Sequence, residues 1–61
     1  MDNRIPKFRI LEDRVGDFYA EIWDNNNWLY LGGSLHRNLE DVRAFLSLIR
    51  VDDRVVEVIY E

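Results

Sequence analysis

The chain has 61 residues, enough for one small domain, and it contains no cysteine, which excludes disulfides and thiolate metal sites. A single histidine excludes a histidine-based metal cluster, and a net charge of −4 argues against simple electrostatic binding of nucleic acid. A chain this short buries only about 60% of the surface that its unfolded form exposes. We therefore expect its stability to depend on tight packing, on oligomerisation or on a partner.

The first half of the chain predicts three strands after a loose N-terminal arm at residues 1–6. Each strand alternates apolar and polar residues and is rich in strand formers: residues 7–13, 18–23 and 28–32. Gly16 suits the turn between the first two strands. Asparagines in the loop at residues 24–27 tolerate the left-handed conformations that a hairpin turn needs.

The second half predicts one helix and a fourth strand. Asn38 is the expected N-cap of a helix over residues 38–50, with Asp41 three residues later as in a capping box. Its buried stripe is Leu39, Val42, Phe45, Leu46 and Ile49. Val42 and Phe45 are expected among the most buried residues. Residues 54–60 are β-branched and complete a β-β-β-α-β order. This order predicts a single α+β domain over residues 1–61, a mainly antiparallel sheet with one helix packed on one face.

Alternation along the strands separates the residues that face the helix from those that face away. The expected helix-facing residues are Phe8, Ile10, Phe18, Ala20, Ile22, Leu29, Leu31, Val56 and Val58. The residues expected on the other face are Tyr19, Glu21, Trp23, Trp28 and Tyr30, with Leu11, Val55 and Ile59 beside them. An exposed patch of this size usually marks an interaction site. The alternatives are cross-strand pairing that only stabilises the sheet, and base stacking, although Glu21 in the middle favours a protein partner or self-association.

Acidic residues gather at both ends of the predicted sheet. One group is Glu12, Asp13, Asp17, Glu40 and Asp41, and the other is Asp24, Asp52 and Asp53. Turns and helix caps favour aspartate in any protein, which is one explanation. Pairing with arginines and lysines of a partner is the other. The complete set of predicted partner-binding residues is Tyr19, Glu21, Trp23, Asp24, Trp28, Tyr30, Asp52 and Asp53.

The sequence shows no pattern typical of catalysis. Ser34 and His36 lie close together, but neither a glycine elbow nor a third orienting group accompanies them. The Gly-Gly-Ser run at residues 32–34 lacks the lysine and the spacing of a phosphate-binding loop. Asp52 and Asp53 lack the ligand spacing of a calcium loop. We expect no enzymatic activity, no cofactor and no metal.

Three resemblances accompany these patterns. "KFR", "YAEIWD" and "WLYLGG…NLEDVRAFL" are similar to segments of the AP2-type DNA-binding domain over residues 7–46. This resemblance implies a three-stranded sheet on a helix, and DNA contacts from arginines; Arg9 and Arg14 stand at such positions, whereas Glu12 and Trp23 occupy others. "GDFYAEIWD…GGS…NLEDVRAFL" resembles antitoxin domains of the HicB type, which implies a β-β-β-α-β order. Size, charge and the absence of catalytic motifs resemble small acidic phage proteins such as anti-CRISPR inhibitors, some of which mimic DNA.

The leading hypothesis is a non-enzymatic protein-binding module that inhibits a larger, nucleic-acid-binding partner by covering a functional surface. The alternatives are an AP2-like DNA-binding module and a HicB-like antitoxin. A homodimer is also considered, and direct binding of nucleic acid is not expected. The sequence has neither an apolar run near 20 residues nor the apolar segment of a signal peptide, so we expect a cytoplasmic protein without membrane association, in the host cell if a phage or mobile element encodes it.

Overall fold

The computed structural model describes residues 7–60, so the expected arm at residues 1–6 lies outside the described residues. The elements are β1 (Phe8–Glu12), β2 (Phe18–Asp24), β3 (Asn27–Tyr30), α1 (Leu39–Leu48), a short 3-10 helix η1 (Asp52–Arg54) and β4 (Val55–Tyr60). The predicted β-β-β-α-β order and α+β class are therefore confirmed. In the part of the chain that the structure describes, no helix is long and apolar enough to cross a membrane.

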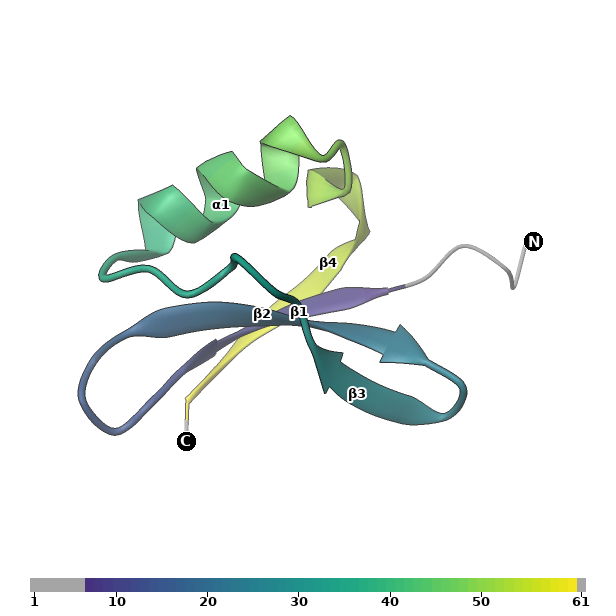
Figure 1. Cartoon of the computed structure of the whole chain (residues 1–61), viewed down its shortest axis with the longest axis horizontal. Helices are drawn as coiled ribbons and strands as arrows, with labels where there is room; N and C mark the ends of the chain where they lie inside the picture. The colour runs from purple at the N-terminus through teal and green to yellow at the C-terminus, as the bar shows by residue number, and fades with distance from the viewer. Residues whose placement is uncertain (1–6, 61) are drawn as a thin grey trace.

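The four strands form one mixed sheet in the order β3-β2-β1-β4. β2 pairs antiparallel with β1 and β3, whereas β4 pairs parallel with β1 because the chain crosses over through α1 before β4 begins. β3 and β4 are the two edges. Figure 1 shows α1 on one side of the sheet, and none of the helices that the structure describes lies on the other side.

The two hairpin turns use the residues that the sequence singled out. Asn25 and Asn26 both have positive φ, 52° and 67°, and Asp24 pairs with Asn27. The loop is therefore a two-residue turn, tighter than the four residues expected. In the other turn Gly16 has a φ of 88°, and the Asp13 carboxylate accepts hydrogen bonds from the backbone N–H groups of Val15 and Asp17.

A buried serine continues the pairing of β2 after β3 has ended. The backbone N–H of Ala20 donates to the Ser34 hydroxyl at 2.9 Å, and that hydroxyl lies 2.6 Å from the carbonyl oxygen of Leu31 and 3.2 Å from that of Ala20. Two residues later, the backbones of His36 and Phe18 exchange a pair of 2.8 Å hydrogen bonds. The segment that leads to α1 thus stays attached to the sheet, and Ser34 is fully buried.

The caps of α1 explain its length. Asn38 accepts a 2.8 Å hydrogen bond from the backbone N–H of Asp41, which fixes the start of the helix as predicted. At the other end Arg50 has a φ of 61°, and its N–H donates to Ser47 while that of Val51 donates to Leu46. This is a Schellman motif with arginine in the position that usually holds glycine. It ends α1 at Leu48, so the predicted end at residue 50 was two residues too late.

The core lies between α1 and the two central strands. Its buried members are Phe8, Ile10, Ala20, Val42 and Leu46. Val42 is fully buried, as predicted. Phe45 was expected to be equally buried, but it is only half-buried, because it packs at the margin against Gly33 while Leu46 takes the central position.

Two residues assigned to the helix-facing side do not lie in the core. Phe8 lies opposite Val55 and Ile10 lies opposite Val58, so β4 has one more residue than β1 between these pairs. This bulge interrupts the alternation, brings Val55 into the core and leaves Val56 55% exposed. Leu29 is also exposed, because it belongs to the edge strand β3 and α1 packs chiefly against β2.

Candidate functional site

The side of the sheet opposite α1 carries most of the residues predicted to bind a partner. We call it the open face and define it by the residues whose strand register places them there: Arg9, Leu11, Tyr19, Glu21, Trp23, Trp28, Tyr30 and Ile59. Among the helices that the structure describes, none covers this face (Figure 1). The predicted grouping of Tyr19, Glu21, Trp23, Trp28 and Tyr30 on one face is therefore present.

Arg9 and Glu21 form an ion pair at the centre of the open face. Arg9 and Glu21 are directly opposite each other on β1 and β2. The Arg9 Nε–H donates to Glu21 Oε1 at 2.7 Å, and a second guanidinium nitrogen lies 2.6 Å from the same oxygen. The guanidinium carbon also lies 4.3 Å from the centroid of the Trp28 ring, which is a cation–π contact. Both charges are partly shielded from water, so this pair is stronger than a fully exposed one.

The four aromatic side chains form two cross-strand pairs. Trp23 and Trp28 are directly opposite, with ring centroids 5.2 Å apart in an edge-to-face arrangement. Tyr19 and Tyr30 are diagonal neighbours with centroids 6.0 Å apart. Such pairs contribute roughly 0.5–1.5 kcal/mol beyond their burial. The aromatic residues therefore stabilise the β2–β3 hairpin, whatever else they bind.

Burial on the open face is uneven. Leu11 is only 5% exposed although no helix covers it, because Tyr19 and Ile59 flank it on the neighbouring strands. In contrast, Trp23 is 39% exposed and Tyr30 is 56% exposed. The accessible aromatic surface is thus concentrated toward the β2–β3 hairpin.

A shallow hollow of about 370 Å³ lies at the same end of the open face. Its walls are Trp23, Trp28, Val56 and Lys7. The backbone of Lys7 accepts a hydrogen bond from the N–H of Trp23, which places this residue beside the tryptophan pair. The hollow can accommodate an apolar side chain next to a positive charge.

The acidic residues at the two ends of the sheet differ in their local contacts. At the hairpin end Asp24, Asp52 and Asp53 are all exposed, and Asp53 forms a 4.0 Å ion pair with Arg54. At the opposite end Asp13 caps the β1–β2 turn, and Asp41 accepts a hydrogen bond from the Asn38 side chain. The hydrogen bonds of Asp13 in the turn and of Asp41 at the helix cap are sufficient to explain why these two positions hold aspartate.

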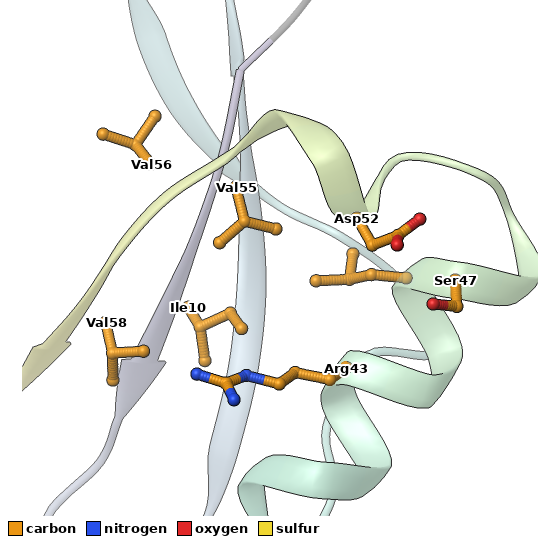
Figure 2. Close-up of a pocket in the computed structure, with 8 residues that line it drawn as sticks. Ile10, Arg43, Ser47, Asp52, Val55, Val56 and Val58 are labelled. Atoms are coloured by element: carbon orange, nitrogen blue, oxygen red, sulfur yellow. The ribbon is translucent and has the colours of Figure 1, made fainter.

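The structure separates Asp52 from the other predicted partner-binding residues. Asp52 begins η1 and lines a groove beside α1, on the side of the sheet opposite the open face (Figure 2). Asp24 is the last residue of β2, next to the tryptophan pair. The predicted set therefore divides between two surfaces.

Ser34 and His36 are held by backbone groups rather than by each other. The Ser34 hydroxyl contacts the backbone of Ala20 and Leu31, and His36 Nδ1 lies 2.8 Å from the Ser34 carbonyl oxygen. Both side chains thus have structural roles where the chain leaves the sheet. Among the side chains that the structure describes, no group of three or more histidine, aspartate or glutamate residues could hold a metal ion.

The sequence-based prediction of the site omitted Lys7, Val56 and the central position of Arg9. The alternation of residues along β1 and β2 could have placed Arg9 opposite Glu21, because both residues occupy positions whose side chains point to the open face. The hollow could not be found in this way, because Val56 reaches it only through the bulge in β4.

In comparisons with known proteins, no family model matches this chain, and neither a curated protein nor a solved structure matches it.

Proposed function

We propose that this chain is a small non-enzymatic protein-binding module whose open face covers a functional surface of a larger partner and inhibits it. The observation that carries the proposal is an ordered aromatic sheet face with exposed Trp23 and Tyr30 beside the Arg9–Glu21 pair. Exposed aromatic patches usually mark interaction sites, and Trp, Tyr and Arg are the residues enriched in binding hot spots.

The arrangement suits binding because it is formed before a partner arrives. The cross-strand pairs and the Arg9 cation–π contact fix the four aromatic rings relative to one another. Rings held in this way lose little rotational freedom on association, and reduced ordering cost raises affinity. Fully buried aromatic side chains cover about 150–250 Å² each, against roughly 800 Å² per partner in a standard interface.

A nucleic-acid-binding protein is the partner that the charges favour. The net charge is −4, and the exposed carboxylates of Asp24 and Asp53 flank the hairpin end of the sheet. Such carboxylates can pair with arginines and lysines that otherwise contact phosphate. This is the chemistry of a DNA-mimicking inhibitor, of the type found among anti-CRISPR proteins.

Capture from a cytoplasmic extract of the source cells tests the proposal. We expect one protein to be retained by the immobilised wild type and by Val15→Ala, which alters a residue 81% exposed in the β1–β2 turn, away from the open face. The same protein should be lost with Tyr30→Ala. The purified partner should then lose its nucleic-acid binding when the wild-type chain is added. Retention by all three proteins, or nucleic-acid binding that persists in the complex, would contradict the proposal.

The element order favours the antitoxin alternative over the AP2-like one. The HicB-type resemblance implies a β-β-β-α-β order, which is the order present, whereas the AP2-type resemblance implies three strands and leaves β4 without a counterpart. An antitoxin would bind a partner that is toxic when expressed alone. Restored growth on co-expression of the captured partner with wild type, and not with Tyr30→Ala, is the result that the antitoxin alternative predicts.

A further inference from the structure

We propose that the groove between α1 and β4 binds an aliphatic monocarboxylate, which is a hydrocarbon chain that carries one carboxylate group. The groove has a volume of about 550 Å³, within the range of roughly 300–1,000 Å³ that is usual for small-molecule sites. Its apolar lining includes Ile10, Leu46, Val55 and Val58. A mostly apolar lining with a few polar groups is typical of a ligand site.

The groove exists because the single helix does not extend over the edge of the sheet. α1 packs chiefly against β2, while β4 lies beyond β1 at the edge. Val55 and Val58 therefore border the core on one side and remain only half-buried. A hydrocarbon chain that lies between α1 and β4 would complete their burial, which favours its binding.

Arg43 determines the charge of the group that the groove can hold. This residue lies on α1, and its side chain extends across the groove toward Ile10 and Val58 (Figure 2). Among the residues that the structure describes, none forms a hydrogen bond or an ion pair with the Arg43 side chain. A guanidinium group presents a planar set of N–H donors that matches the two oxygens of a carboxylate. Arg43 therefore selects an anionic group at this end, next to the apolar lining.

Asp52 limits the ligand to one carboxylate. It begins η1 at the Val55 end of the groove, and its carboxylate is directed toward Ser47 (Figure 2). A second carboxylate at this end would approach a like charge, which is unfavourable. The two ends of the groove thus differ in charge, and a ligand with a single carboxylate suits both of them.

This site is separate from the surface that we propose for partner binding. The groove lies on the α1 side of the sheet, whereas the open face lies on the other side. A ligand in the groove would leave the aromatic rings of the open face accessible. The inference therefore does not depend on the proposed function.

An NMR titration of the purified full chain with octanoate tests the site. We expect saturable binding with a dissociation constant below about 1 mM, and the largest chemical-shift changes at Ile10, Leu46, Val55 and Val58. Octanol should bind about fivefold more weakly or worse, because it has the hydrocarbon chain without the charge. The dicarboxylate suberate should also bind about fivefold more weakly or worse, because its second carboxylate approaches Asp52.

Arg43→Gln tests the assigned counter-ion. Glutamine forms helices about as well as arginine, so α1 should persist in this variant. Octanoate affinity should fall about fivefold or more, while octanol affinity stays unchanged. Arg37→Gln is the matched control, because Arg37 is exposed ahead of α1 and is not among the residues that line the groove.

Four results would each overturn the proposal. One is an octanoate dissociation constant above about 1 mM, or shift changes that lie outside the groove. The second is octanol binding as tight as that of octanoate, and the third is equally tight binding of suberate. The fourth is an equal response to Arg43→Gln and Arg37→Gln. The comparisons among octanoate, octanol and suberate use the wild type alone, so they remain decisive even if a variant does not fold.

Discussion

The guanidinium carbon of Arg9 lies 4.3 Å from the centroid of the Trp28 ring, although β1 and β3 are not adjacent in the sheet. β2 separates them, and its Glu21 accepts the hydrogen bond that holds Arg9 in place. One side chain thus connects three strands across the open face. The surface that we propose for partner binding and the stability of the hairpin share this residue.

Arg9→Ala should therefore destabilise the fold by about 1–2 kcal/mol. The change removes a partly buried ion pair with Glu21 and a cation–π contact with Trp28. Arg14→Ala is the control, because Arg14 is exposed in a turn and should change stability by less than about 0.5 kcal/mol. Urea unfolding measures both variants, and equal effects would mean that the contacts of Arg9 contribute little.

Ser34→Ala tests the buried hydroxyl. Its removal leaves the backbone N–H of Ala20 without its hydrogen-bond partner in a buried position. A loss of about 1–3 kcal/mol is expected from such an unsatisfied donor. Hydrogen exchange at the Ala20 amide should accelerate by more than global unfolding explains. Ser47→Ala, at an exposed helix position, should be nearly neutral; a neutral Ser34→Ala would contradict the assigned role.

Arg50→Gly should stabilise the protein. Arg50 occupies the left-handed position of the Schellman motif, where a side chain costs about 1 kcal/mol and glycine costs little. We expect a gain of about 0.5–1 kcal/mol in thermal or urea unfolding. Ala44→Gly introduces the same residue at an exposed position inside α1 and should instead destabilise by about 1 kcal/mol. A loss of stability in both variants would mean that the helix ends differently.

Binding to duplex DNA should be negligible near physiological salt. The net charge is negative, and Arg9, a position where the AP2-type resemblance implies a DNA contact, is already paired with Glu21. A fluorescence anisotropy titration over a salt series measures this directly. Submicromolar, sequence-dependent binding would place the AP2-like alternative first.

Local signals in the sequence were sufficient for most of the fold. The asparagine turn, the Asn38 cap and the alternation in β1 and β2 all depend on neighbouring residues, and each is present. The failures involve nonlocal structure. The bulge in β4 depends on its pairing with β1, and the half-burial of Phe45 depends on where α1 crosses the sheet.

The part of the candidate site that lies on strands was also predictable, because the alternation of residues along a strand determines which side chains share a face. Strand parity grouped Tyr19, Trp23, Trp28 and Tyr30 correctly. It could not show that Asp52 lies in the groove beside α1, since η1 has no strand periodicity. Nor could it show the contact between Arg9 and Trp28, which spans an intervening strand.

The affinity of Tyr30→Ala for the captured partner, measured with the stability of the same variant, tests the central claim most directly. Tyr30 is 56% exposed at the edge of the sheet, so its removal should lower the free energy of unfolding by less than about 1.5 kcal/mol. Partner affinity should fall by about 30-fold or more, which corresponds to the roughly 2 kcal/mol of a hot spot. Unchanged affinity together with a large loss of stability would show that the aromatic residues of the open face serve the fold rather than a partner.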